Sequence, residues 1–286
     1  MADNSAFAKF VFRHHLKNNV SFPIFFMGDF HLDARKTDVG FIERELEKAR
    51  ELDARIILLG DIFDGIWCGD PRYMPAVSIQ RLEGRNQLIR ETVQYGKEFL
   101  KPYADLIDII AIGNHEETVL KHHHYNLIQE LCRELTTDDH VVNYGKRSGN
   151  AFYRFEYPNG GAVQTVKIHY THGSGGSAPV TDGLIKMKHK KIHLEGFDIH
   201  VSGHTHTQAY APKVAFYPSD NDAEMKERHA NLICVGSYGD LIEDGWESTK
   251  EFAPQRKGGY YADVQLVGKY RDKSIEIRHI TNRVRR

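Results

Sequence analysis

Seven side chains of the kinds that bind metal ions follow five short apolar runs in this sequence. They are Asp29, His31, Asp61, Asn114, His172, His204 and His206. Residues two apart in an extended segment point the same way, so the pair at 29 and 31 can face one centre, as can the pair at 204 and 206. Any one of the aspartates, or the asparagine, could instead cap a turn or a helix. Their joint occurrence after five runs favours a common site.

The donor atoms of this set belong to two carboxylates, one amide and four imidazoles. Such a mixture suits Mn, Fe or Zn. The three cysteines, Cys68, Cys132 and Cys234, form no C-x-x-C pair, so the sequence indicates neither a thiolate metal site nor a disulfide framework. Seven donors are too many for one ion, and the set therefore predicts two ions that share a carboxylate.

Strands that end just before the candidate ligands would bring those ligands to one edge of a sheet. Apolar runs predict strands at 24–27, 56–59 and 106–112, each followed by Gly-Asp or Gly-Asn. Apolar residues at helical spacing predict helices over 39–52, 79–100 and 117–134. In α/β sheets ligands bind at the carboxyl ends of strands, and a glycine there lets the backbone approach closely.

Shorter segments of alternating polarity make up the second half of the chain and predict sheet. They are 151–157, 163–171, 199–202, 213–217, 231–235, 260–267 and 274–280, with one basic helix expected over 182–194. The chain has 286 residues, 41% of them apolar, and no internal repeat or linker. We expect one α/β domain over 1–286, with two packed mixed β-sheets flanked by helices. Its motif-bearing core spans about 22–240, and C-terminal strands follow over 260–280.

Charge and composition limit the classes of partner. The formal net charge is -1, so the chain as a whole does not attract nucleic acid or anionic lipid, and any such affinity must be local. The sequence contains no stretch of 18 apolar residues and no apolar core of signal-peptide type near its start, which argues against a membrane protein. Together with the sparse cysteines, these features predict a cytoplasmic protein.

The motif order of the chain resembles that of a known enzyme superfamily. The motifs D-x-H, G-D-x-x-D, G-N-H-E, H-G and G-H-x-H occur in this order between about Gly28 and His206. Chain and motifs thereby resemble the calcineurin-like metallophosphoesterase superfamily. The resemblance implies a four-layer αββα sandwich and the hydrolysis of phosphate esters with two divalent metal ions. It implies Mn²⁺ first, with Fe, Zn, Ni or Mg as alternatives.

The same resemblance implies a role for each candidate residue. One ion would be bound by Asp29, His31 and His206, the other by Asn114, His172 and His204, and Asp61 would bridge the two. His115 would not be a ligand but would protonate the leaving oxygen, and Asp64 would hydrogen-bond His115 and orient it. His169 is a rival to His172, but its place in the middle of a predicted strand favours His172.

The surroundings of the motifs favour one class of substrate. Gly65 follows Asp64, where Ser/Thr phosphatases of the superfamily have an arginine, so the resemblance is nearer to phosphodiesterases and nucleases that act on a nucleotide or nucleic-acid phosphate. Candidate substrate contacts are Arg72 in the loop 67–75, and Lys186 and Lys188 in the basic stretch 186–191. The alternatives are a phosphomonoesterase or protein phosphatase, with an arginine at 72, 81 or 85 in place of the missing one, and a catalytically silent metal-binding scaffold.

Overall fold

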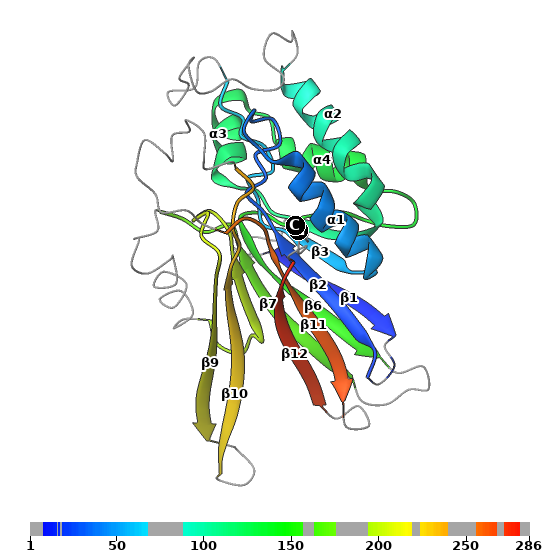
Figure 1. The fold of residues 1–286 in the computed structure, drawn as a ribbon, viewed down its shortest axis with the longest axis vertical. Coiled ribbons are helices and arrows are strands. Elements are labelled where there is room, and N and C mark those ends of the chain that lie inside the picture. Colours follow the sequence, from blue (N-terminus) through cyan, green and yellow to red (C-terminus); the bar gives the residue numbers. More distant parts are fainter. Residues whose placement is uncertain are drawn as a thin grey trace, which may run out of the picture.

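Two six-stranded mixed β-sheets form the body of the protein in a computed structural model (Figure 1). The structure describes residues 8–15, 17, 19–67, 88–156, 163–175, 194–218, 224–239, 256–267 and 272–280. Sheet A has the order β1 (Ala8–His15), β6 (Ser148–Glu156), β7 (Gln164–Thr171), β8 (Ile199–Ser202), β10 (Met225–Cys234) and β9 (Ala209–Pro218). Sheet B has the order β12 (Asp272–His279), β11 (Tyr260–Val267), β2 (Ser21–Met27), β3 (Arg55–Leu58), β4 (Ile107–Ile110) and β5 (Asn143–Tyr144). The expected α/β fold with two mixed sheets is confirmed.

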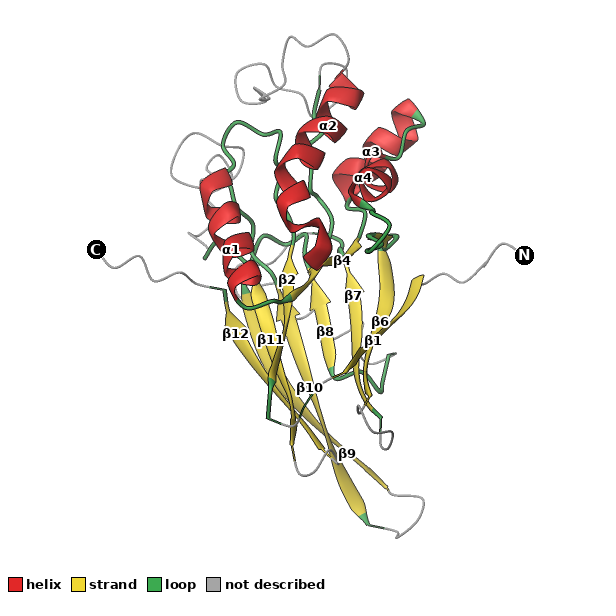
Figure 2. Cartoon of the chain, turned by 90° about the vertical axis from the view of Figure 1, so that its right-hand side faces the viewer, coloured by secondary structure: helices red, strands yellow, loops and turns green. Residues whose placement is uncertain are grey.

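Helices cover the outer face of sheet B. The described helices are α1 (Val39–Glu51), α2 (Leu88–Leu100), α3 (Asn114–His123) and α4 (Leu127–Leu135), with a 3₁₀ helix η1 (Lys101–Leu106) between α2 and β4. Figures 1 and 2 show these helices gathered on one side of the molecule, while the β9–β10 hairpin extends away from them. None of the described helices is long and apolar enough to cross a membrane. The basic helix expected over 182–194 lies outside the described residues, except for Leu194.

Strand β2 shows why the apolar runs of the first half are continuous. Its alternate residues Phe25 and Met27 belong to the core between sheet B and the helices, whereas Ile24 and Phe26 belong to the core between the two sheets. All four side chains are fully buried. A strand that is buried on both faces needs apolar residues at successive positions, which is the pattern of the inner strands of α/β proteins.

Parallel pairing places several strand ends at the same edge. Strand β3 runs parallel to both β2 and β4 in sheet B, and β7 runs parallel to β8 in sheet A. The carboxyl ends of these five strands lead directly into the five motifs. The topology therefore places the candidate ligands at one end of both sheets, as predicted from their positions after the strands.

The single helix expected over 117–134 is wrong. The structure has two helices there, because His124 adopts a left-handed conformation with φ of 54° and its N–H donates to the carbonyl of Leu120, which ends α3. Asn126 then starts α4 by accepting the N–H of Gln129 at 3.0 Å. The first of the two helices also begins at Asn114 and not at 117, so that Asn114 and His115 lie in the first turn of α3.

Candidate metal centre

The turns after β2, β3, β4, β7 and β8 meet where the two sheets end. Groups of metal-binding side chains come within 4.8 Å of one another there: Asp29, His31 and His206; Asp61, His172 and His204; and His31, Asp64 and His115. The first two groups divide six of the residues singled out from the sequence in the way that the family resemblance implies. Asn114 joins the second group through its side-chain oxygen, which lies 2.9 Å from Nε2 of His172.

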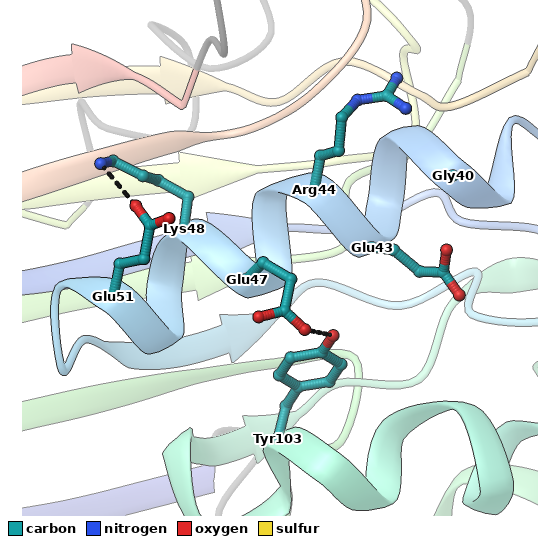
Figure 3. A pocket seen from close by; sticks show the side chains of 7 residues that line it. All are labelled: Gly40, Glu43, Arg44, Glu47, Lys48, Glu51 and Tyr103. Carbon is teal, nitrogen blue, oxygen red and sulfur yellow. Dashed lines mark hydrogen bonds and ion pairs between the residues drawn. The ribbon is translucent and has the colours of Figure 1, made fainter.

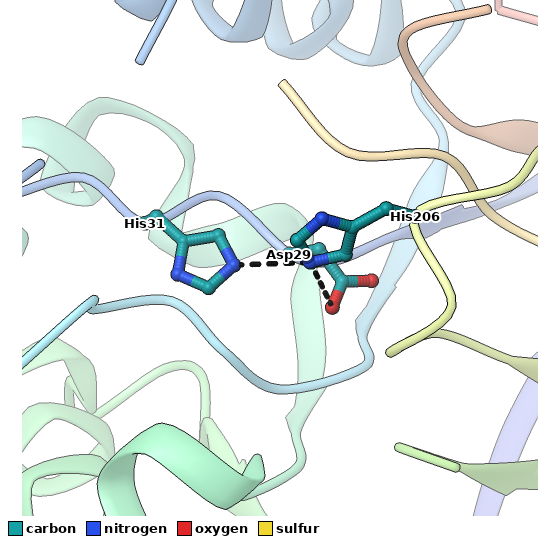
Figure 4. Close-up of side chains that lie close together, drawn as sticks. All are labelled: Asp29, His31 and His206. Atoms are coloured by element: carbon teal, nitrogen blue, oxygen red, sulfur yellow. Dashed lines mark hydrogen bonds and ion pairs between the residues drawn. The ribbon is translucent and has the colours of Figure 1, made fainter. Parts of the chain in front are cut away.

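The first group combines two imidazoles and a buried carboxylate (Figure 4). Nε2 of His31 lies 3.3 Å from Nε2 of His206, which lies 3.7 Å from Oδ1 of Asp29. The carboxylate of Asp29 is fully buried and accepts the backbone N–H of His204 at 2.9 and 3.0 Å. Burial raises the pKa of Asp29. Three electron-pair donors thus point at one place from two different sheets.

The second group is arranged around His172. Its Nδ1 lies 2.9 Å from the carbonyl of Leu59, which accepts a hydrogen bond from it, so that Nε2 faces the other donors. That Nε2 lies 3.3 Å from Oδ2 of Asp61 and 3.2 Å from Nδ1 of His204. With the oxygen of Asn114, four polar atoms of the kinds that bind metals converge on one buried point.

Electrostatics around His172 show that this point attracts positive charge. Burial disfavours the imidazolium form, but the carboxylate of Asp61 outweighs it and raises the pKa of His172 to about 9. For the neighbouring His204, burial and the charge of His172 lower the pKa to about 4. Converging oxygen and nitrogen donors of this kind fit a divalent ion of the Mn, Fe or Zn type. The donors of both groups therefore fit the metal centre that the motifs imply.

Backbone strain is concentrated at the same residues. Five of the candidate ligands have positive φ angles: Asp29 (54°), His31 (48°), Asp61 (48°), His204 (73°) and His206 (54°). Residues with a Cβ atom adopt this region at a cost, and such residues cluster at functional sites. Backbone bonds across the strand ends hold two of them, since the N–H of Asp29 donates to Gly60 and that of His31 to Asp61. The strained backbone of these turns therefore directs the side chains toward the common site.

This strain predicts that glycine stabilises the metal-free protein at one ligand position. We expect His206→Gly to be more stable than His206→Ala by about 1 kcal/mol, because only glycine adopts a positive φ without steric cost. Thermal unfolding of both variants in the presence of a chelator measures the difference. Exposed Lys121 in α3 is the matched control, since alanine should be the more stable there by about 1 kcal/mol. Equal stability of the two His206 variants would contradict the strain.

Gly113 allows Asp61 to take its position. A Cβ atom on Gly113 would lie 2.0 Å from Oδ1 of Asp61 and 2.3 Å from its backbone nitrogen. The same Oδ1 accepts the backbone N–H of His115 at 3.0 Å. The glycine before Asn114 is thus required by the close approach of the carboxylate that the resemblance places between the two ions.

His115 is held with one ring nitrogen toward the site and the other away from it. Its Nε2 lies 4.0 Å from Oδ2 of Asp61, on the side of the second group. Its Nδ1 lies 2.6 Å from the backbone carbonyl of Asp64 and 3.2 Å from Oδ1 of the same residue. The structure therefore places Asp64 beside His115, as the resemblance implies, with the carbonyl as the nearer acceptor. Oδ1 of Asp64 also lies 3.3 Å from Nδ1 of His31.

Two buried carboxylates support these turns and were not singled out from the sequence. Glu116 accepts the backbone N–H groups of Asp61, Phe63 and Gly113, and burial followed by the charge of Asp61 raises its pKa to about 7. Asp33 accepts those of Asp64 and Gly65. The sequence does carry a signal for Glu116: it is the third residue of α3, and a glutamate at that position often accepts the backbone N–H of the N-cap residue. For Asp33 the only signal in the sequence is its position two residues after His31.

Other residues considered in the sequence lie elsewhere or are not described. Nδ1 of His169 lies 2.9 Å from Oδ1 of Asn150, and its ring packs near Phe197, so the structure does not bring it to the two groups. Trp67 is buried in the core beneath the helices. Arg72, Lys186 and Lys188, with positions 81 and 85, lie outside the described residues.

A hollow on the surface of α1 is separate from these groups (Figure 3). Its lining is Gly40, Glu43, Arg44, Glu47, Lys48, Glu51 and Tyr103. Within the lining, Lys48 bonds Glu51, and Glu47 accepts the hydroxyl of Tyr103. It contains none of the candidate ligands, and we assign it no function.

Comparisons with known proteins find similar solved structures. A predicted phosphoesterase of Streptococcus pneumoniae is 12% identical and has a TM-score of 0.32, with 91% of each chain covered. A metallophosphoesterase of Sphaerobacter thermophilus is 15% identical and has a TM-score of 0.35, with 91% of this chain and 89% of the other covered. GAP50, the anchor in the inner membrane complex of Plasmodium, is 12% identical with a TM-score of 0.43 and covers 92% of this chain and 84% of its own. Neither protein-family profiles nor curated proteins match the sequence.

In motif order the chain resembles the calcineurin-like metallophosphoesterases, and it has the two mixed β-sheets that this resemblance implies. The function proposed below rests on the geometry of the side chains.

Proposed function

We propose that the chain hydrolyses phosphate esters with two divalent metal ions, Mn²⁺ first among them. The observation that carries this proposal is the convergence of four donor atoms, from Asp61, Asn114, His172 and His204, beside a second group of three. Asp29, His31 and His206 would hold the second ion, and Asp61 would bridge. One domain in a cytosolic setting is part of the proposal, and the two cysteines that the structure describes are free thiols.

The chemistry needs a charge-neutralising centre and a proton donor beside it. Two bound divalent ions would polarise the phosphoryl oxygens and make water a better nucleophile. The role of the chain is to hold seven donors in place and to bring His115 to the edge of the group. Nδ1 of His115 donates a hydrogen bond to the Asp64 carbonyl, and in the imidazolium form Nε2 then carries the proton toward a leaving oxygen.

Gly65 supports a diester substrate. This residue has a φ of 60°, and a Cβ atom there would lie 3.1 Å from Cγ2 of Val119. A side chain at this place would be strained and would press on Val119, which disfavours an arginine where the motif of the Ser/Thr phosphatases carries it. We propose a phosphodiesterase that acts on a nucleotide or nucleic-acid phosphate.

A parallel assay tests this proposal. The purified chain is offered bis(p-nitrophenyl) phosphate and p-nitrophenyl phosphate, each with Mn²⁺, Ni²⁺, Zn²⁺ or Fe²⁺. We expect the diester to be hydrolysed with the higher kcat/KM, most rapidly with Mn²⁺. A preference for the monoester would instead support the phosphomonoesterase or protein phosphatase. Metal binding without turnover of either ester under any metal would support the silent scaffold.

A further inference from the structure

We infer that Asp33 is a positioning residue for the proton donor, acting through the peptide group between Asp64 and Gly65. The inference rests on the proposed function and deepens it, because it names the group that sets the orientation of His115. Asp33 is fully buried and belongs to none of the groups of candidate ligands.

Both carboxylate oxygens of Asp33 are used by the backbone. Oδ1 accepts the N–H of Asp64 at 2.5 Å, and Oδ2 accepts the N–H of Gly65 at 3.0 Å. A carboxylate whose two oxygens accept hydrogen bonds from two successive N–H groups fixes the direction of that stretch of chain. It is therefore placed to orient the turn after β3 and not to bind an ion itself.

One of these N–H groups belongs to the same peptide unit as the carbonyl that holds His115. The Gly65 N–H and the Asp64 carbonyl are joined by a planar bond, and in a trans peptide they point in opposite directions. Asp33 binds the N–H end, and Nδ1 of His115 lies 2.6 Å from the oxygen end. Because the plane is rigid, fixing one end fixes the other, and the charge on Asp33 also polarises the carbonyl toward the imidazole.

The Asp64 side chain is a weaker candidate for this role. Its Oδ1 lies 3.2 Å from Nδ1 of His115 but also 3.3 Å from Nδ1 of His31, so it is shared between two rings. A single N–H on Nδ1 bonds best to the nearer acceptor, which is the carbonyl. The backbone at 64–65, and hence Asp33, contributes more to the orientation of His115 than the carboxylate singled out from the sequence.

A pair of esters that differ in the leaving group tests the inference. The p-nitrophenyl and phenyl esters of thymidine 5′-phosphate share one nucleotide, but only the phenyl ester needs a proton on the departing oxygen. Asp33→Asn keeps the shape of the side chain, but its NH₂ group replaces one acceptor oxygen and would face a backbone N–H, which cannot accept a hydrogen bond. We expect kcat for the phenyl ester to fall about 10- to 100-fold, with KM unchanged, as for other residues that orient a functional side chain. Turnover of the p-nitrophenyl ester should change by no more than about threefold, because it does not depend on the acid.

A double-mutant cycle separates positioning from general damage. In the His115→Asn background, Asp33→Asn should have no further effect on the phenyl ester, because both changes remove the same function. Asp263→Asn, a change at another buried carboxylate, is the control and should affect the two esters equally. Equal losses for both esters in Asp33→Asn, or additive losses in the cycle, would overturn the inference.

Two further results keep the inference testable if Asp33→Asn does not fold. Asp33→Glu retains both oxygens on a longer side chain and should show the same selective loss for the phenyl ester. In the wild type, the amide proton of Gly65 should exchange slowly with deuterium, and rapid exchange would refute the contact. A wild type that hydrolyses neither ester with any metal would instead overturn the proposed function, and with it the catalytic role of Asp33.

Discussion

Asp61→Asn is expected to lose metal binding and turnover together. Burial alone would raise the pKa of Asp61, but the neighbouring His172 and His115 hold it well below its usual value, so the group is an anion in the folded protein. Asparagine has the same shape and no charge. It also brings an N–H₂ group toward Nε2 of His172, which lies 3.3 Å from Oδ2 of Asp61. An amide N–H there would donate to the electron pair of Nε2 of His172, which the proposed metal ion would need.

The expected size of the loss is large because Asp61 serves both groups of donors in the proposed centre. We expect Mn²⁺ affinity to fall at least about 100-fold, above the range for residues that only support a ligand. Turnover of bis(p-nitrophenyl) phosphate should fall by at least about 1,000-fold, since the charge stabilisation of a metal-assisted reaction is lost with the ions. Calorimetric titration with Mn²⁺ and the diester assay measure the two quantities on the same preparation.

An exposed aspartate provides the control for this variant. Asp139→Asn removes the same charge in a surface turn and should leave affinity and turnover unchanged. If Asp61→Asn kept wild-type affinity while losing turnover, Asp61 would act on the substrate and not as a bridging ligand. The assignment of the two groups of donors would then be wrong at its centre.

The convergence of the candidate ligands was predictable from the sequence because their signal is local. Each follows a strand closely, and each is of a residue type that binds metals, so type and position agree without knowledge of the fold. The choice between His172 and His169 illustrates the limit of such reasoning. His169 lies three residues before His172, and the structure shows His172 beside Asp61 and His169 beside Asn150.

The supporting residues were not predictable, since their partners are backbone groups. Asp33 acts on the N–H groups of residues about thirty positions away, and no pattern of residue types marks a backbone N–H. The positive φ angles of the ligands were missed for a similar reason, because aspartate and histidine, unlike glycine, do not mark a left-handed turn in the sequence.

The fold shows the same division between local and long-range information. Strand β1 was not predicted, because its edge position leaves alternate residues exposed and it gains its order by pairing with β6, more than a hundred residues away. The end of α3 was missed because the α3 pattern continues into α4, although Asn126 is a typical N-cap residue. Strands β9 and β10 are longer than their apolar stretches, since the outer part of the hairpin is exposed.

His115→Asn is expected to keep both metal ions and to lose turnover. The side chain lies outside the two groups of donors proposed to bind metal, so its removal leaves their atoms in place. Asparagine cannot give up a proton to a leaving oxygen, and the loss of a general acid costs about 10²- to 10⁴-fold in rate. The phenyl ester of thymidine 5′-phosphate should therefore lose more than the p-nitrophenyl ester. Exposed His122, in the same helix, gives the control His122→Asn, which should behave as the wild type.

The third group, His31, Asp64 and His115, makes this test decisive for the assignment. Were that group a metal site, His115→Asn would empty it, and titration would show one ion fewer than in the wild type. The orientation of His31 argues against this outcome: its Nε2 faces His206 at 3.3 Å, and its Nδ1 faces the Asp64 carboxylate at 3.3 Å. An imidazole that binds a metal through one nitrogen donates its other N–H to such an acceptor. In the proposed site Asp64 would then anchor two histidines, one that binds metal and one that moves the proton, and the stoichiometry of two should survive the loss of His115.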